Sequence, residues 1–395
     1  MPDYRYLIVG GGMSADAACR GIRDRDAEGA IGLVGEEEHP PYSRPPLSKA
    51  LWQGKDEASI WRGTEELGVD LHLGRRVVAV DLAARRVTDD RGESYGYEKL
   101  LLATGGRPRQ LPGDDGDSGV FYFRHLPEYR ALRALANTEA TFVVLGGGFI
   151  GSEVAAGLRT VGSNVTLVFP EDGIGARLFP PELAVSVNEL YRSHGVEVLP
   201  GELVSRVERD GSRFRVHLQS GRALEGDGVV AGLGVVPNTE LAEQAGLLID
   251  DGIVVDEYGR AGGRDDVYAA GDVARFPAPI LGTHIRVEHE DQANSHGRAV
   301  GANMAGAGEP YEHLPFFYSD LFELGYEAVG EVDSRRPITA RWVEPDRKGV
   351  VAYLDDARRP RGFLLVDVWG KVDAATELIA AGRPVDEAAL DGLLA

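Results

Sequence analysis

The chain has 395 residues, more than one hydrophobic core usually supports, so we expect two or three domains. Its composition is that of an ordinary globular protein, and its formal net charge of -21 repels phosphate backbones and anionic lipid heads. We therefore expect no nucleic-acid and no membrane partner. The first residues lead directly into a strand-like run without a signal peptide or membrane span, and we expect a cytoplasmic protein.

Cysteine content restricts the redox chemistry. The one cysteine, Cys19, can form neither an internal disulfide nor a Cys-x-x-Cys pair, which excludes dithiol chemistry within the chain. Cys19 falls in the first predicted helix, on a face with Ala15 and Ile22. We expect it to be a small buried apolar residue.

A strand, a glycine-rich turn and a helix open the chain. After the predicted strand Tyr4–Val9, Gly10 permits a tight turn and Gly12 lets backbone amides approach a pyrophosphate, while Ala15 allows the helix to pack closely on the strand. Glu36 lies 21 residues beyond Ala15, after the next predicted strand, where an acid binds a ribose hydroxyl. The pattern predicts a Rossmann unit with a dinucleotide at the helix N-terminus.

A β-rich stretch follows the first unit. Val69–Leu102 holds short strand-like runs with turn signals and is predicted to be an antiparallel insertion rather than another βα unit. It ends in a run of small residues, Ala103-Thr104-Gly105-Gly106.

The opening pattern recurs far downstream. Thr141–Leu145 is predicted to be a strand, and Gly146, Gly148 and Gly151 match the G-x-G-x-x-G spacing before a second helix. The repeat predicts a second dinucleotide-binding domain.

One acid and one arginine bear on the second nucleotide. Glu171 lies 20 residues beyond Gly151, where it would bind a bare ribose 2'-hydroxyl and repel a 2'-phosphate, so we expect NADH. NADPH stays the alternative nucleotide, because a nearby arginine such as Arg177 can accommodate the 2'-phosphate. Glu171 as a solvated turn residue is the structural alternative.

Two later segments complete the organisation. Val267–Asp272 is predicted to hold a strand that closes back onto the first domain. From about Pro315 alternating strands and a last amphipathic helix predict a third, smaller domain.

A proline-stiffened segment carries two cations. Three prolines between Pro41 and Lys49 hold Arg44 and Lys49 at fixed positions, which suits contacts with a flavin and its phosphates. Lys49 as an ordinary surface lysine is the alternative.

These motifs together resemble the FAD-dependent pyridine nucleotide reductases of the ferredoxin and rubredoxin reductase type, and most closely apoptosis-inducing factor and its bacterial relatives. The resemblance covers nearly the whole chain and rests on five segments in family order: Tyr42 to Lys49, Ala103 to Gly106, Gly147 to Glu153, Ala270 to Asp272, and Val287 to His289.

The resemblance implies an α/β fold with two Rossmann-like dinucleotide-binding domains, as in glutathione reductase, and a small α+β C-terminal domain. The implied domains are a discontinuous FAD-binding domain (1–114 and 245–314), an NAD(H)-binding domain (115–244) and a C-terminal interface domain (315–395).

The resemblance also assigns site residues. Lys49 would lie near flavin N5 and pair with Glu153, and a cation there favours the reduced flavin. On the FAD side the expected residues are Gly10, Gly12, Ala15, Glu36, Arg44, Lys49, Thr104, Gly105, Arg124, Asp272, Glu288, His289 and Tyr318. On the NAD side they are Gly146, Gly148, Phe149, Ile150, Gly151, Glu153, Glu171, Arg177 and Gly232.

Two of these residues differ from what many family members carry. His289 follows Glu288 where many ferredoxin and rubredoxin reductases carry Glu-Ser, so it favours the apoptosis-inducing-factor branch; a structural histidine is the alternative. Tyr318 stands where the family usually has Trp, which keeps aromatic stacking and puts an indole charge-transfer contribution in doubt. We expect Lys49, Glu153 and His289 to act in catalysis.

The expected function is an FAD-dependent NAD(P)H reductase that passes hydride from NADH to FAD and then electrons to an acceptor such as ferredoxin or rubredoxin. Arginine doublets at 75–76, 85–86, 335–336 and 358–359 are candidates for a basic docking surface, although most such doublets are solvated hairpin ends. The alternative is an NADH-binding redox sensor with slow turnover and ligand-linked dimerisation. A thiol-assisted disulfide or peroxide reductase is nearly excluded, because Tyr42 to Lys49 has no cysteine, and no metal site is expected.

Overall fold

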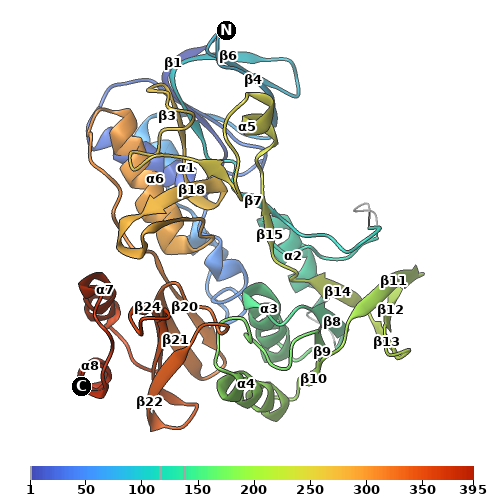
Figure 1. Cartoon of the computed structure of the whole chain (residues 1–395). Coiled ribbons are helices and arrows are strands. Elements are labelled where there is room, and N and C mark those ends of the chain that lie inside the picture. The colour runs from blue at the N-terminus through green and yellow to red at the C-terminus, as the bar shows by residue number, and fades with distance from the viewer. Residues whose placement is uncertain (1, 115–117, 137–138) are drawn as a thin grey trace. The chain divides into compact units, whose positions relative to one another are not determined.

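The computed structural model describes residues 2–114, 118–136 and 139–395 (Figure 1). These residues divide into two compact units, which are described separately. The first comprises Met1–Ser43, Ala58–Arg107 and Val236–Pro315, and the second comprises Arg44–Glu57, Pro108–Val235 and Phe316–Ala395.

The first unit is built on one mixed sheet. Its longer elements are β1 (Asp3–Val9), α1 (Met13–Arg23), β2 (Ile31–Val34), β3 (Val69–His72), β4 (Val77–Asp81), β5 (Arg86–Asp89), β6 (Ser94–Leu102), β17 (Val267–Ala269) and α6 (Glu290–Met304). The strand order is β3-β2-β1-β6-β5-β4, and β17 also pairs with β6. Strands β1, β2, β3, β6 and β17 are parallel, as the Rossmann prediction requires.

The antiparallel insertion predicted over Val69–Leu102 is partly wrong. Only β4, β5 and the first residues of β6 pair in antiparallel fashion. Strand β3 instead extends the parallel sheet beside β2, because the chain between these two strands is long enough for a crossover connection. The predicted closing strand near Val267 is confirmed, since β17 runs parallel to β6.

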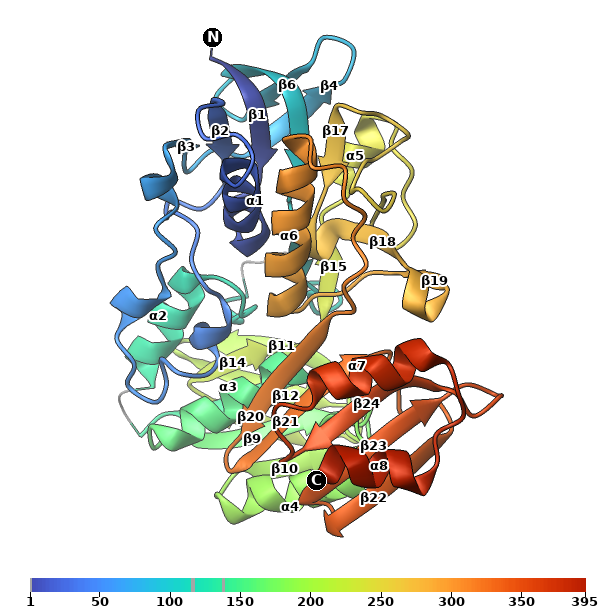
Figure 2. The ribbon, with the colours of Figure 1, turned by 90° about the vertical axis from the view of Figure 1, so that its left-hand side faces the viewer.

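Helices α1 and α6 run side by side against this sheet (Figure 2). Glycines allow the close approach: a Cβ at Gly21 would lie 2.0 Å from the Arg298 carbonyl oxygen, and one at Gly301 would lie 2.1 Å from the Ala18 oxygen. The buried apolar role predicted for Cys19 is confirmed, because its side chain is fully buried and burial raises the pKa of its thiol.

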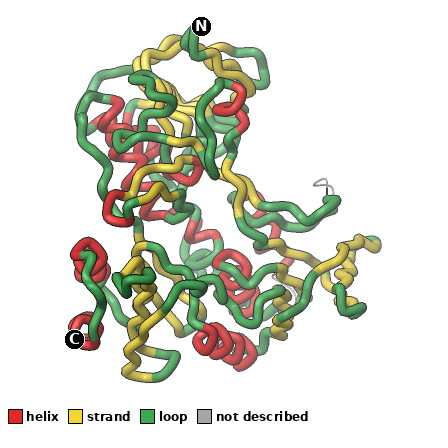
Figure 3. The backbone as a smooth tube through the Cα atoms, viewed as in Figure 1, coloured by secondary structure: helices red, strands yellow, loops and turns green. Residues whose placement is uncertain are grey.

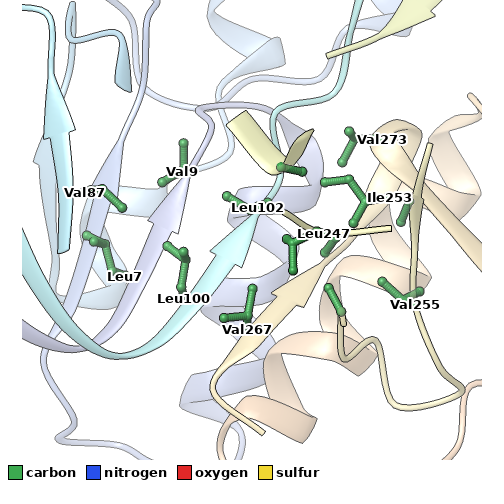
Figure 4. Close-up of a cluster of buried hydrophobic side chains, with 14 of the residues drawn as sticks. Leu7, Val9, Val87, Leu100, Leu102, Leu247, Ile253, Val255, Val267 and Val273 are labelled. Carbon is green, nitrogen blue, oxygen red and sulfur yellow. The ribbon is translucent and has the colours of Figure 1, made fainter. Parts of the chain in front are cut away.

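The first unit has a buried apolar cluster on each face of its sheet, one beneath α1 and a second on the opposite side. Figure 4 shows apolar side chains of β1, β6 and β17 meeting those of the later segments of the same unit. Leu7, Leu100 and Val267 are fully buried there. Burial of this apolar area stabilises the parallel sheet whose strand ends carry the first glycine loop.

Shorter elements complete the first unit. They are η3 (Thr64–Leu67), α5 (Glu240–Gln244), β16 (Ile253–Val254), η4 (Gly271–Val273), β18 (Ala274–Ala278), η5 (Pro279–Leu281) and β19 (Thr283–Ile285). The chain passes from one unit to the other after Ser43 and after Pro315, and also within three short elements: η2 (Glu57–Ile60), β7 (Gly106–Pro108) and β15 (Val235–Pro237).

The second unit begins with another parallel sheet. Its elements up to residue 231 are η1 (Pro45–Leu47), α2 (Leu126–Leu135), β8 (Thr141–Leu145), α3 (Phe149–Thr160), β9 (Asn164–Phe169), α4 (Pro181–Ser193), β10 (Glu197–Pro200), β11 (Val204–Asp210), β12 (Arg213–Leu218), β13 (Ala223–Gly226) and β14 (Gly228–Ala231). The order β10-β9-β8-β14 is all parallel, and β11-β12-β13 form a separate antiparallel sheet. The second predicted Rossmann core is therefore present.

An antiparallel sheet of order β20-β21-β24-β23-β22 forms the C-terminal part of the second unit. Its elements are β20 (Phe316–Leu321), β21 (Leu324–Gly330), β22 (Ile338–Glu344), β23 (Lys348–Leu354), β24 (Pro360–Val366), α7 (Val372–Ala381) and α8 (Glu387–Leu394). Both helices, red beside the yellow strands in Figure 3, cover one face of the sheet with Ile379 and Leu390 buried. The structure thus has two C-terminal helices where the sequence predicted one.

The other face of this sheet packs on the second Rossmann core. The Tyr353 hydroxyl donates to the Leu178 carbonyl at 2.6 Å, and the rings of Phe179 and Tyr326 meet edge to face with centroids 5.1 Å apart. Strand β20 lies against helix α3. The second glycine helix and the C-terminal sheet are therefore joined in one compact unit.

Residues 44–57 also belong to the second unit. The Trp52 indole donates to the Leu47 carbonyl at 2.7 Å and meets the Tyr129 ring edge to face. A Cβ at Gly157 of α3 would lie 2.6 Å from the indole. These contacts fix the segment that carries Lys49 on helix α3.

Candidate functional site

The first glycine loop connects β1 to α1. Gly10 has φ 128°, and a Cβ there would lie 2.1 Å from the Ala103 carbonyl oxygen, so no other residue fits. Gly12 is the N-cap of α1 in extended conformation, and no side chain caps the helix. Ala15 is fully buried. An N-terminus that no side chain caps suits an anion such as the pyrophosphate that the sequence analysis expects there.

The other predicted residues of the first unit follow the carboxyl ends of neighbouring parallel strands. Glu36 is exposed just after β2, Thr104 and Gly105 follow β6, and Asp272 follows β17. The Thr104 hydroxyl donates to the Asn238 carbonyl at 2.8 Å, and the Asn238 amide donates back to the Thr104 carbonyl at 2.9 Å. Ligands of doubly wound sheets bind at this edge.

Glu288 and His289 precede helix α6 in the same unit. The Glu288 carboxylate pairs with Arg286 at 2.5 Å, and Arg286 also donates to the Asp272 carbonyl at 3.2 Å. His289 is half-buried and is the N-cap of α6. Arg286, which the sequence reasoning missed, therefore connects Glu288 to the backbone of Asp272.

The second glycine loop connects β8 to α3. A Cβ at Gly146 would lie 2.3 Å from the Gly232 oxygen, one at Gly151 would lie 1.9 Å from the Gly146 oxygen, and one at Gly232 would lie 2.7 Å from the Gly151 nitrogen. A Cβ at Gly148 would meet no atom within 4 Å. Three glycines are thus required by packing, whereas Gly148 faces open space.

Four further residues expected on the NAD side belong to the same unit as this loop. Phe149 and Ile150, in the first turn of α3, are 39% and 36% exposed, although large apolar side chains usually prefer burial. Glu171 follows β9, and Arg177 lies 3.1 Å from its Oε1. The Arg177 side chain is 90% exposed, so water screens this pair and Arg177 is free to reorient.

Lys49 and Glu153 form the ion pair that the resemblance implied. The Lys49 Nζ lies 2.7 Å from Glu153 Oε1, with the side chains 19% and 3% exposed. The Tyr318 ring lies 5.9 Å from the same ammonium and is 45% exposed. The Glu153 carboxylate is thus almost inaccessible to water, whereas the Lys49 side chain is partly exposed.

Two serines that the sequence reasoning missed bind the same carboxylate. The Ser319 hydroxyl donates to Glu153 Oε1 and the Ser48 hydroxyl donates to Oε2, each at 2.6 Å. Both serines are buried, at 1% and 4% exposure. A polar residue within the apolar run of a predicted strand, as at Ser319, was the available signal.

Arg44 and Arg124 also meet in the second unit. The Arg44 guanidinium donates to the Arg124 carbonyl at 3.2 Å. The residues expected on the FAD side are therefore divided: Arg44, Lys49, Arg124 and Tyr318 belong to the second unit, and the others belong to the first.

The arrangement fits two dinucleotides. Each unit presents a helix N-terminus that no side chain caps, approached through a glycine turn and accompanied by an acid after the next parallel strand. Among the described residues, no His, Cys, Asp and Glu group is arranged to hold a metal ion. Residues that would hold FAD and a nicotinamide dinucleotide are thus present.

The chain belongs to the pyridine nucleotide-disulphide oxidoreductase family, whose model matches residues 4–299. The family resemblance predicted from the motifs is confirmed, and with it an FAD- and nicotinamide-dependent oxidoreductase. Residues 300–347 match the C-terminal model of mitochondrion-associated apoptosis-inducing factor. In a family named for disulphide reduction, this chain has one cysteine.

Individual relatives lie in both expected branches. The ferredoxin–NAD(+) reductase component of the anthranilate 1,2-dioxygenase system of Burkholderia cepacia is 34% identical over 96% of this chain and 95% of its own length. Mitochondrial apoptosis-inducing factor 1 of Dictyostelium discoideum is 32% identical over 97% of this chain and 80% of its own. The solved covalent putidaredoxin reductase–putidaredoxin complex matches with TM-score 0.91 and 30% identity over 100% of this chain and 99% of that one.

Proposed function

We propose that the protein is an FAD-dependent reductase that oxidises NADH and delivers the electrons to a ferredoxin-type protein. The observation that carries the proposal is the pair of strand–glycine–helix loops, each followed by an acid after the next strand, within one chain. Relatives that match nearly the whole length and are named ferredoxin reductases support it.

Bound FAD supplies hydride acceptance and the release of single electrons, and the protein supplies binding, orientation and electrostatics. We assign the pyrophosphate of FAD to the amides after Gly12 and its ribose to Glu36. Lys49 places a positive charge that favours a reduced flavin, and Glu153 holds that charge in place. Phe149 and Ile150 offer apolar surface to the nicotinamide side.

NADH is the proposed electron donor. Glu171 follows β9 where it would accept hydrogen bonds from a ribose diol, and its negative charge opposes a 2'-phosphate. The charge of Glu171 therefore supports NADH over NADPH. Arg177 does not decide between the two nucleotides, because its exposed pair with Glu171 is screened by water.

The arginine doublets support a docking patch less than the sequence suggested. Their guanidinium groups mostly pair with carboxylates of this chain, as in the following pairs: Arg75–Asp89, Arg85–Asp266, Arg86–Asp3, Arg335–Asp333, Arg336–Glu331 and Arg359–Asp355. We therefore propose an iron–sulfur acceptor on the strength of the relatives and assign it no basic surface.

An anaerobic titration tests the function. The purified protein is expected to show a flavin spectrum, to bleach at lower concentrations of NADH than of NADPH, and to be reoxidised rapidly by a bacterial ferredoxin. If no flavin binds when FAD is added, the proposal is wrong. Bleaching without reoxidation by ferredoxin or rubredoxin would reject the acceptor class alone.

A redox sensor is the second candidate. His289 beside Glu288 and the match of residues 300–347 to the apoptosis-inducing-factor C-terminal model favour it. In this case NADH leaves a long-wavelength charge-transfer band that outlasts exposure to air, and the protein dimerises on reduction. Loss of the band within seconds of mixing with air would exclude this reading.

Further features of the protein remain our proposals. They include the division into FAD-binding, NAD(H)-binding and C-terminal domains at residues 114, 244 and 314, a homodimer, and a cytoplasmic location. Among the described residues, no helix combines the length and apolar character needed to cross a membrane.

A further inference from the structure

We propose that Ser48 and Ser319 are positioning residues of the redox site, whose hydroxyls hold the Glu153 carboxylate so that Lys49 presents its ammonium to the flavin from a fixed place. Their removal changes the reduction potential of the flavin, and the change is transmitted through Glu153. This inference rests on the proposed function, because it requires that the protein bind FAD.

The demand of a buried carboxylate for donors is the first argument. An ionised carboxylate offers about four lone-pair sites, and a buried one that lacks donors is strongly destabilising. Lys49 supplies one contact to Glu153, at 2.7 Å. The two serine hydroxyls supply charge-assisted hydrogen bonds at 2.6 Å, one to each oxygen. With these bonds made, the ammonium need not turn all its N–H groups to Glu153.

Convergence of three segments is the second argument. Ser48 follows η1, Glu153 lies in α3 and Ser319 lies in the middle of β20. Their side chains meet although they are far apart in the sequence, and all three residues are less than 5% exposed. A hydroxyl on a paired strand is held more rigidly than one on a loop, so Ser319 makes the C-terminal sheet part of the support of Lys49.

Tyr326 on the neighbouring strand helps to hold Ser319 in place. It lies directly opposite Ser319 on β21 and shares a hydrogen bond with it. Burial, reinforced by the nearby charge of Glu153, raises the pKa of the Tyr326 phenol well above its usual value, so the phenol stays protonated and neutral. Tyr326 therefore adds no charge of its own beside the carboxylate.

The expected sign follows from electrostatics. Donors that point at Glu153 offset part of its negative charge, and in a site with little water that offset is felt by neighbouring groups. When a hydroxyl is removed, more negative charge remains uncompensated near Lys49. Negative charge opposes the addition of electrons to a flavin, so its reduction potential becomes more negative.

The test measures reduction potentials of the FAD-bound protein by spectroelectrochemical titration, with the FAD dissociation constant measured alongside. Ser48→Ala and Ser319→Ala are each made in the wild-type and in the Glu153→Gln background. Ser163→Ala is the matched control, because Ser163 is a fully buried serine of the same unit whose hydroxyl has no hydrogen-bond partner among the described residues.

Both serine variants are expected to shift the potential to more negative values, and the shift is expected to vanish in the Glu153→Gln background. Ser163→Ala is expected to leave the potential unchanged. No shift, a shift of opposite sign, or an equal shift in both backgrounds would overturn the inference. If Ser319→Ala does not fold, Ser48→Ala and Ser319→Thr replace it in the test. Ser319→Thr keeps a hydroxyl and is expected to keep the wild-type reduction potential. Absence of bound flavin in the wild type would instead reject the proposed function.

Discussion

The ammonium of Lys49 lies 2.7 Å from a carboxylate oxygen of Glu153, a residue of helix α3 whose side chain is almost completely buried. Removing one partner of such a pair leaves an uncompensated buried charge, which usually costs about 3–5 kcal/mol, whereas removing both costs much less. Substitutions of Lys49 or Glu153 are therefore expected to change the free energy of unfolding as well as the proposed flavin site.

We expect Lys49→Met to lower the free energy of unfolding by about 3 kcal/mol, and Lys49→Met/Glu153→Gln to lower it by less than the single variant. Urea denaturation of the protein with FAD removed measures this, because bound flavin would add its own binding free energy. Lys55→Met, at an exposed lysine of the same unit, serves as a control for loss of a lysine. Equal losses in the single and double variants would show that the pair is not coupled.

The two glycines Gly148 and Gly151 differ in what a methyl group would meet. At Gly151 a Cβ would lie 1.9 Å from the Gly146 oxygen, so Gly151→Ala is expected to destabilise the protein by about 1–3 kcal/mol. At Gly148 no atom lies within 4 Å and φ is -82°, which any residue adopts.

Gly148→Ala is therefore expected to keep wild-type stability within about 0.5 kcal/mol and to raise the KM for NADH about tenfold or more, because the methyl group occupies the approach of the pyrophosphate. Thermal unfolding and steady-state kinetics measure the two effects. A Gly148→Ala protein with an unchanged KM would place the nucleotide elsewhere.

The glycine loops could be predicted because their requirements are local. Gly10 and Gly146 need positive φ and close backbone contacts, and these needs appear as a short motif between a strand and a helix. The parallel pairing of β3 was missed because a four-residue strand carries no pattern that separates parallel from antiparallel neighbours.

The support of Glu153 could not be predicted from local patterns. Ser48, Glu153 and Ser319 meet only through long-range packing, and a single serine in each segment is not a motif. The pairing of the Arg85 guanidinium could not be predicted for the same reason, since its partner Asp266 is distant in sequence. The sequence gives the number of charged residues, but which of them pair with one another depends on the fold.

The acid after β9 is expected to set the nucleotide preference. Glu171→Ala removes the partner of the ribose diol and the repulsion of a 2'-phosphate, and it frees Arg177 from its ion pair. We expect the ratio of kcat/KM for NADH to that for NADPH to fall by about tenfold or more. Glu197→Ala, an exposed ion-paired glutamate on neighbouring β10, is the control. An unchanged ratio would mean that Glu171 is a solvated turn residue.

The buried ring of His296 is expected to make folding sensitive to mild acid. His296 is fully buried in the first unit, where it lies beside the rings of Phe276 and Tyr311, with centroid distances of 4.8 Å and 4.7 Å. The Gly271 amide donates to its Nδ1 at 3.4 Å. Burial lowers the pKa of His296 from 6.5 to about 3, so the folded protein holds it neutral.

The direction of the effect follows from proton binding. Between pH 6.5 and about 3 the unfolded chain binds this proton and the folded chain does not, so the stability due to neutral His296 is complete above pH 6.5 and is lost as the pH falls. The slope is up to about 1.4 kcal/mol per pH unit. The neighbouring Tyr311 phenol does not titrate in this range, because burial raises its pKa.

His296→Asn keeps an acceptor for the Gly271 amide and removes the titrating ring. We expect the variant to lose less stability than the wild type between pH 7 and pH 5, a range in which most carboxylates stay ionised. Urea midpoints measured at several pH values in this range give the two slopes. His284→Asn is the control, because His284 is exposed in the folded protein and meets water in both states. Parallel slopes for the wild type and His296→Asn would show that His296 is not held neutral by burial.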